Sequence, residues 1–273
     1  MNLKVYGCRG SIPLSHTGGC RYGGNTSCMV IESNGEFLVF DAGSGLIGLE
    51  KDLRKKYKDY PALPSPLNLI VSHLHLDHII GLASLRAAWN KDNMLRIHSA
   101  RSGDNLIEQI LKPFEPPYWP VSMAENSTVE CIYIEPGVPF KVGCFTIIAF
   151  LANHTDETYS YHVTDGEKTF VHLLDSEVAT TSKDTYDELI EFCKDADMII
   201  FDGAYSPDDY HEFVGWGHST VLDGIKLARE TNCKKMIFSH FAQFYTDDAL
   251  DSWKKYFDTD QFLMAYDGME LQI

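Results

Sequence analysis

Short apolar runs bounded by turns alternate along the chain with stretches of helical spacing. Runs of about four to eight apolar residues between polar or proline-containing turns are typical of buried strands. In the first half of the chain, such runs predict strands over residues 3–6, 28–32, 37–41, 68–72 and 94–98, the fourth preceded by a turn with Pro64 and Pro66. Helical spacing predicts helices over residues 46–57, 78–89 and 104–111.

The second half begins with runs that we expect to form antiparallel strands. They cover residues 129–133, 138–141, 145–152, 159–163 and 169–174. An alternating unit follows, with helices over 183–194, 220–231 and 247–256 and strands over 198–201 and 235–238. The segment KPFEPPYWPVSM (112–123) is too rich in proline for either regular element. This order predicts a layered α/β fold, a four-layer αββα sandwich that forms one domain over residues 1–273.

The sequence LIVSHLHLDHIIG (69–81) places metal-capable side chains at the end of a predicted strand. They are His73, His75, Asp77 and His78. Imidazole and carboxylate ligands suit first-row metals, and the carboxyl edge of a sheet is where layered α/β folds usually bind ligands. Residues two apart in an extended segment point the same way, so His73 and His75 are expected to hold one ion. Asp77 and His78 are expected to face a second ion as the chain turns into a helix.

Four ligands are too few for two ions, and later strand ends supply candidates. His154, Asp175 and His240 each follow a predicted strand. Asp175 is the best bridging ligand, because a carboxylate between two dications offsets their repulsion, and each ion keeps a position for a shared water. Taken alone, each residue also has a structural interpretation, as a hydrogen-bonded histidine or, for Asp175, a helix N-cap. The structural interpretation is kept for the remaining histidines: His16, His98, His162, His172 and His211.

Charge and cysteine content limit the binding partners and the cellular compartment that we expect for this protein. The chain has 23 basic and 39 acidic residues, a formal charge of −16, which disfavours long nucleic acids. A small anion stays acceptable, because bound divalent metals reverse the local charge. Seven cysteines without paired CxxC spacing, and no signal peptide or apolar run of membrane-spanning length, predict reduced thiols, a cytoplasmic location and no membrane association. Cys8, Cys20 and Cys28 are interpreted as small buried side chains rather than as metal ligands.

The HLHLDH sequence, followed in order by His154, Asp175 and His240, resembles the metallo-β-lactamase superfamily. Supporting motifs are YGGNTSC (22–28), FDAGSG (40–45) and DGMEL near the end. The resemblance covers essentially the whole chain and implies the αββα fold of that superfamily. It also implies a metal-dependent hydrolase with two divalent transition-metal ions, zinc first, with manganese or iron as alternatives.

Within the superfamily the chain is most similar to the ribonuclease Z-like phosphodiesterases. The deciding segment is GHSTVLDGIKLARETNCKKMIFSHF (217–241), preceded by a strand that ends in Asp202. The resemblance implies that Asp202 orients His218 and that His218 protonates the leaving oxygen. The alternative is that both are strand-end and helix-cap residues. No long Gly/Pro-rich arm of the kind that clamps tRNA in ribonuclease Z is visible, and neither is the zinc-binding cysteine insertion of the phosphoribosyl cyclic phosphate phosphodiesterases.

These observations favour a phosphodiesterase acting on a small phosphodiester, preferably a cyclic nucleotide or another cyclic phosphate. The candidate catalytic residues are Asp77, His218 and Asp202, and the candidate substrate contacts are Tyr118, Trp119, Asn25 and Ser219. The FEPPYWP loop is either an aromatic lid that stacks a base or a hydrophobic cover of the core or of a homodimer contact.

Two other functions stay open. A thioesterase or lactonase of the same superfamily is the alternative enzyme, although such relatives typically lack the His-Ser-Thr motif. A non-catalytic metal-binding or ligand-carrier protein would be expected to have lost metal ligands, and none is missing here. An oxygen-reducing di-iron relative would carry an acidic residue at the position of His75 and is disfavoured.

Overall fold

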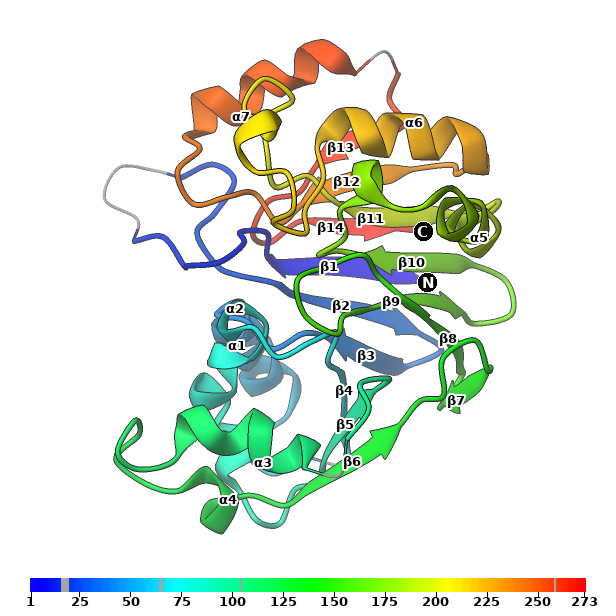
Figure 1. Cartoon of the computed structure of the whole chain (residues 1–273). Coiled ribbons are helices and arrows are strands. Elements are labelled where there is room, and N and C mark those ends of the chain that lie inside the picture. Colours follow the sequence, from blue (N-terminus) through cyan, green and yellow to red (C-terminus); the bar gives the residue numbers. More distant parts are fainter. Residues whose placement is uncertain (16–19, 64–65, 104, 258) are drawn as a thin grey trace.

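The computed structural model describes residues 1–15, 20–63, 66–103, 105–257 and 259–273, which form two seven-stranded sheets packed face to face (Figure 1). The turn at Pro64, the histidine at position 16 and the predicted helix start at position 104 lie outside the described residues. The first sheet has the order β14-β1-β2-β3-β4-β5-β6 and the second the order β13-β12-β11-β10-β9-β8-β7.

The first sheet is built mainly from the first half of the chain and is completed by its last strand. Its strands are β1 (Asn2–Gly7), β2 (Cys28–Ser33), β3 (Glu36–Phe40), β4 (Leu67–Ile70), β5 (Leu95–Ser99), β6 (Val129–Tyr133) and β14 (Glu270–Gln272). Strands β3 to β6 are parallel to one another, while β14 and β2 flank β1 in antiparallel pairs.

The second sheet is mixed in the same way. Its strands are β7 (Phe140–Val142), β8 (Phe145–Leu151), β9 (Tyr159–Thr164), β10 (Thr169–Leu173), β11 (Met198–Asp202), β12 (Met236–Ser239) and β13 (Phe262–Met264). Strands β10 to β13 are parallel, and β9 is antiparallel to both β8 and β10. Strands β8, β10, β11 and β12 therefore all end at the same edge of the sheet.

Helices cover the outer face of each sheet. The helices beside the first sheet are α1 (Leu46–Lys56), α2 (Leu76–Ile79), α3 (Leu106–Leu111) and α4 (Met123–Asn126), and those beside the second are α5 (Lys183–Cys193), α6 (Val221–Thr231) and α7 (Asp247–Trp253) (Figure 1). Short 3-10 turns are η1 (Ile80–Ser84), η2 (Arg86–Trp89), η3 (Lys112–Phe114), η4 (Val178–Thr180), η5 (Tyr210–Glu212) and η6 (Lys254–Tyr256). This is the predicted four-layer αββα sandwich, with buried side chains between the sheets and under each helical layer.

Two expectations about the elements are corrected, and two strands are added. The helix predicted over 78–89 is only the single turn α2 followed by η1 and η2, because the Gly81 amide donates to Ala42 O (2.7 Å) instead of continuing the helical ladder. Strand β6 pairs in parallel with β5 and belongs to the first sheet, not to the antiparallel strands that follow. The short strands β13 and β14 were not predicted. Among the described residues, no helix is long and apolar enough to cross a membrane.

Candidate metal centre and proton donor

The loop between β4 and α2 brings the first two predicted ligands together. His73 follows β4, and His75 occupies the N-cap position of α2 with an extended backbone. His73 Nε2 lies 2.8 Å from His75 Nδ1, and His154 Nε2, from the loop after β8, lies 3.3 Å from the same atom. These three imidazoles form one group that can hold a metal ion.

A second group lies beside the first, formed by the first turn of α2 and the end of β12. His78 Nε2 is 3.1 Å from His240 Nε2, and Asp77 Oδ2 is 3.3 Å from His78 Nε2 and 3.2 Å from His240 Nε2. All three side chains are buried. Both sheets therefore contribute to this group, because His78 follows β4 of the first sheet and His240 follows β12 of the second.

Asp175 lies between the two groups. Its Oδ1 is 3.9 Å from His73 Nε2 and from His154 Nε2 and 3.4 Å from His240 Nε2, and its Oδ2 is 3.3 Å from His78 Nε2. The carboxylate thus faces ligands of both groups, in the position that a bridging ligand needs. The structure brings together all seven residues that the sequence predicted as metal ligands.

The donor set fits a pair of cations. Ring nitrogens that face each other at about 3 Å cannot both carry a proton, and Asp175 Oδ2 is buried without a hydrogen-bond partner. Burial lowers the pKa of His73, His75 and His154, which keeps their rings neutral and their lone pairs free for a metal. Neutral imidazoles and carboxylates suit zinc, manganese or iron.

Outer partners orient three of these imidazoles. The Nδ1 atom of His78 lies 2.8 Å from Asp41 Oδ2, that of His154 lies 2.8 Å from Gly217 O, and that of His73 lies 3.1 Å from Ser72 Oγ. A partner on one ring nitrogen fixes the ring and leaves the other nitrogen to face the metal. Asp41 is itself held by the amide and hydroxyl of Ser72 and by the hydroxyl of Ser27.

The backbone is strained where these ligands are placed. Four of the non-glycine residues with positive φ belong to the site or its rim: Ser11 (59°), Asp41 (56°), Asp175 (53°) and His240 (64°). Such conformations are costly for residues with a Cβ and tend to persist where surrounding contacts and function require them. Asp41, Asp175 and His240 each lie one or two residues past a strand end, so the chain changes direction there as it leaves the sheet.

His218 stands at the edge of the metal groups and is paired with Asp202, the last residue of β11. The His218 Nδ1 atom lies 2.8 Å from Asp202 Oδ2, and its ring lies 5.0 Å from the rings of His154 and His240. Burial alone would lower the pKa of His218, but the charge and hydrogen bond of Asp202 raise it to about 9. His218 can therefore hold a proton beside the two groups of metal-capable side chains.

The other two residues of the His-Ser-Thr motif have structural roles. Thr220 caps α6 in a reciprocal capping box with Asp223, so His218 is not the helix cap. Ser219 is buried, donates to Ser176 O (2.6 Å) and accepts from the Val178 amide (3.0 Å). This corrects the expectation that Ser219 contacts substrate, because its hydroxyl is enclosed and already engaged.

Comparison with known proteins shows the family of the chain. Residues 36–241 match the Beta-lactamase superfamily domain. The chain belongs to the beta-lactamase superfamily. It is 26% identical to the probable metallo-hydrolase YhfI of Bacillus subtilis, over 92% of this chain and 91% of YhfI. It is 20% identical to ribonuclease Z of Haloarcula marismortui, over 100% of this chain and 97% of that enzyme.

Solved structures show the same superfamily fold. The crystal structure of YhfI matches with a TM-score of 0.70 at 21% identity, over 99% of this chain and 98% of that chain. A diphosphatase of the PhnP family matches with a TM-score of 0.69 at 15% identity, over 99% and 96% of the two chains. The resemblance predicted from the sequence is confirmed. Members of the superfamily generally bind two divalent metal ions, and the two His/Asp groups here are candidate sites for such ions.

A buried glutamate, Glu177, accepts hydrogen bonds from the loop that carries His218 and so holds this loop in place. Glu177 Oε1 accepts from the Tyr210 hydroxyl (2.7 Å) and the Gly215 amide (2.8 Å), and Oε2 accepts from the Gly217 amide (2.9 Å). Gly217 has a φ of +85°, and a Cβ there would lie 2.2 Å from His154 Nδ1. Glu177 therefore fixes a glycine whose carbonyl orients one predicted ligand and whose neighbour is His218.

We expect Glu177→Gln to reduce the free energy of unfolding by about 1.5–3 kcal/mol, because the amide nitrogen of Gln opposes backbone N–H donors in a buried position. Urea denaturation of the purified protein measures the change. Glu212→Gln is the matched control, since Glu212 lies exposed on the His218 loop that Glu177 contacts, and its effect should stay within about 0.5 kcal/mol. Equal stability of the Glu177 variant and the wild type would contradict the bracing role.

The other three residues predicted to contact substrate are Tyr118, Trp119 and Asn25, and each has a different environment from that of Ser219. The Trp119 ring packs against Trp89 (6.5 Å) and Phe114 (6.2 Å), and Tyr118 is 72% exposed. The Asn25 amide donates to Asp267 Oδ2 (2.9 Å) and its oxygen accepts from Ser44 (3.1 Å). Asn25 therefore joins its loop to the segment of Asp267. The contact of Asn25, Tyr118 and Trp119 with substrate stays a prediction.

Sequence reasoning assigned no role to Asp41, Glu177 or Asp267. Asp267 accepts from the amides of Cys8, Gly24 and Asn25 and so fixes the YGGNTSC loop. The motifs FDAGSG and DGMEL contain Asp41 and Asp267, but their partners lie far away in the sequence. Glu177 stands in no such motif, and the sequence offered only its closeness to Asp175.

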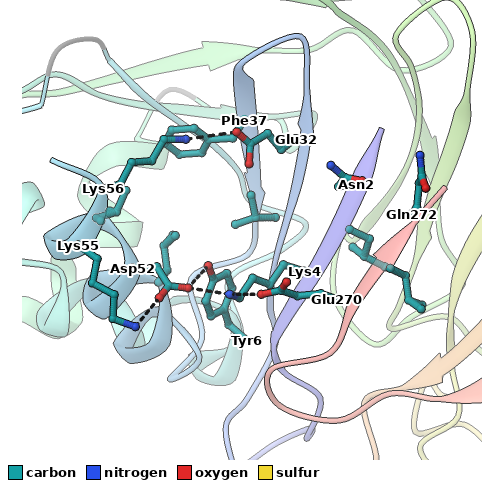
Figure 2. A pocket seen from close by; sticks show the side chains of 15 residues that line it. Asn2, Lys4, Tyr6, Glu32, Phe37, Asp52, Lys55, Lys56, Glu270 and Gln272 are labelled. Carbon is teal, nitrogen blue, oxygen red and sulfur yellow. Dashed lines mark hydrogen bonds and ion pairs between the residues drawn. The ribbon is translucent and has the colours of Figure 1, made fainter.

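A separate hollow lies between α1 and the strands β1 and β14 (Figure 2). Lys4 pairs there with Asp52 (2.8 Å) and with Glu270, and Lys56 pairs with Glu32 (3.3 Å). Its charged residues are thus largely paired with one another, and the described residues that line it include none of the metal-capable His/Asp groups. The candidate active site is therefore at the strand ends.

Proposed function

We propose that this protein is a dinuclear metal-dependent phosphodiesterase that hydrolyses a small phosphodiester, preferably a cyclic nucleotide or another cyclic phosphate. The observation that carries the proposal is the His218–Asp202 pair beside two groups of metal-capable side chains. The thiolate of a thioester leaves readily without such a proton donor, whereas the alkoxide of a phosphodiester is a poor leaving group. Relatives named ribonuclease Z, which act on phosphodiesters, support the same reaction class.

The proposal assigns ligands to two ions. His73, His75 and His154 would hold one ion, Asp77, His78 and His240 the other, and Asp175 would bridge them. Bound at these residues, divalent ions would supply a water of lowered pKa and offset the charge of the phosphate. Zinc is preferred, and manganese or iron would suit the same donors.

The chain's own residues would manage the leaving group. Asp202 holds the Nδ1–H side of His218, so Nε2 can present a proton to the leaving oxygen. Asp202 is fixed in turn by the amides of Ser176 (3.2 Å) and Ala204 (3.0 Å). A ribose alkoxide is a poor leaving group, and a positioned acid is most useful for such an oxygen.

Charge and cysteine chemistry complete the proposal. The formal charge of −16 favours a small substrate over a long nucleic acid, with the ions offsetting the substrate's charge. All seven cysteines are free, which supports a reducing, cytoplasmic location. We also propose that residues 1–273 act as one domain, because both sheets supply predicted ligands.

The reaction class is tested by a substrate panel. We expect the metal-loaded protein to hydrolyse bis(p-nitrophenyl) phosphate and a cyclic nucleotide with a kcat/KM at least about tenfold above that for a β-lactam or a thioester, because differential transition-state binding sets such ratios. The same panel with chelator-treated protein is the control. A clear preference for thioesters would replace the proposal by the carbon-centred hydrolase.

A further inference from the structure

Two large aromatic side chains remain more than half exposed beside His218. Trp216 is 59% exposed and Phe244 is 52% exposed. Trp216 lies in the loop after β11, and Phe244 lies in the loop after β12, so they come from neighbouring strand ends of the second sheet (Figure 1). Exposed large apolar side chains that gather at one place often mark a binding surface.

Further rings hold these two in place. Tyr205 and Phe213 stack with centroids 4.1 Å apart and planes 5° apart. Phe244 lies offset and nearly parallel to Phe213, at 5.7 Å and 20°, and Trp216 meets Phe213 edge-on at 5.6 Å and 89°. Tyr205 is buried, so the cluster has an anchored inner part and an exposed outer part. We call Tyr205, Phe213, Trp216 and Phe244 the aromatic platform.

The platform adjoins the proton donor. The Tyr205 ring lies 5.7 Å from the His218 ring, and Trp216 precedes His218 by two residues. The part of a substrate that leaves with the oxygen protonated by His218 would therefore lie nearest to these rings. In a cyclic nucleotide, one ribose carries both the leaving oxygen and the base.

The charges of the loop favour an uncharged flat group over a second phosphate. Residues 203–219 contain no lysine or arginine, and their carboxylates are Asp208, Asp209 and Glu212. Stacking on an aromatic face needs no counter-charge and accepts any base, since every base has a π-face. Exposed, nearly rigid rings bind at a small cost in conformational entropy.

We propose that the exposed faces of Trp216 and Phe244, backed by Phe213 and Tyr205, bind the base of a nucleotide held at the metal site. This inference deepens the proposed function and rests on it for the position of the phosphate. It assigns the base to the platform rather than to the Tyr118–Trp119 segment.

The test measures binding, so that it does not depend on turnover. Isothermal calorimetry on metal-loaded protein compares adenosine 5′-monophosphate with ribose 5-phosphate, which carries the same phosphate and no base. We expect the wild type to prefer the nucleotide by roughly 5- to 150-fold, the value of one stacked base. Phe244→Leu and Trp216→Leu should each reduce that preference, and the double variant should bring it close to unity, with binding of ribose 5-phosphate unchanged.

One further variant serves as a control, and another tests the competing site for the base. Tyr133→Leu removes a similarly exposed ring on β6, and Tyr118→Leu removes the ring of the proline-rich loop. Both should keep the wild-type preference. An unchanged preference in the double variant, or no preference in the wild type, would overturn the platform, and loss of preference in Tyr118→Leu alone would return the base to that loop.

The same variants separate the platform from the proposed function. If the wild-type protein hydrolyses no phosphodiester but prefers the nucleotide, and the double variant lacks that preference, the platform stands and the phosphodiesterase proposal fails. If the wild type hydrolyses a cyclic nucleotide and glycerol cyclic phosphate, and the double variant keeps the ratio of the two rates, the platform fails and the phosphodiesterase proposal stands.

Discussion

Asp175→Ala is expected to remove both metal ions and to lower phosphodiesterase activity by roughly 10³-fold or more, the loss of several kcal/mol of transition-state stabilisation. Its carboxylate faces both candidate groups, with Oδ1 3.9 Å from His73 Nε2 of the first group and Oδ2 3.3 Å from His78 Nε2 of the second. Without it, two dications would lie close together with no shared anion. Elemental analysis should find about two ions in the wild type and fewer than one in the variant.

Variants within one group should behave differently. Asp77→Ala removes a ligand of the second group only, so it should deplete one ion preferentially and leave the ion of His73, His75 and His154. Asp187→Ala on the exposed face of α5 is the control, since Asp187 forms an exposed ion pair with Lys183. Active protein that contains no metal, or an Asp175 variant that keeps two ions and full activity, would overturn the dinuclear site.

The meeting of the candidate ligands was predictable because they follow one local rule. Each lies just past an apolar strand, and parallel strands that pair in register end at the same edge of a sheet. Asp175, Asp202 and His240 follow or end β10, β11 and β12, which are parallel neighbours in the sheet. The strand-end pattern was therefore enough to predict that Asp175 and His240 lie together, whereas Asp202 was assigned from the resemblance.

Features that depend on distant partners were not predictable in this way. The helical spacing after His78 is real, but the close approach of Gly81 to the Gly43 backbone, where a Cβ would lie 1.9 Å from Gly43 O, diverts the chain from an α-helix. Strand β14 is only three residues long and is defined by its pairing with β1, at the other end of the chain. The aromatic platform likewise joins Phe213 and Phe244 across a helix and a strand.

His218→Ala is expected to leave both metals bound and the fold intact while lowering the rate on a ribose alkoxide leaving group by roughly 10²–10⁴-fold. Its ring contacts the predicted ligands at 5.0 Å, but Thr220 rather than His218 caps α6, so little helix stability depends on it. The loss should be much smaller for p-nitrophenolate, which leaves readily without a proton. Wild-type and variant rates on a cyclic nucleotide and on bis(p-nitrophenyl) phosphate, with metal content measured, give the decisive ratio.

Asp202→Asn should give a weaker form of the same dependence on the leaving group. Asp202 accepts from His218 and Ser176 with one oxygen and from Ala204 with the other, so either orientation of an asparagine amide sets its NH₂ group against a backbone donor. The side chain keeps its shape but holds the protonated imidazole less well. His211→Ala, an exposed histidine on the same loop, is the control and should change neither rate. Equal losses on both substrates for His218→Ala would exclude the role of proton donor, and the metal groups would then act with a leaving oxygen protonated by solvent.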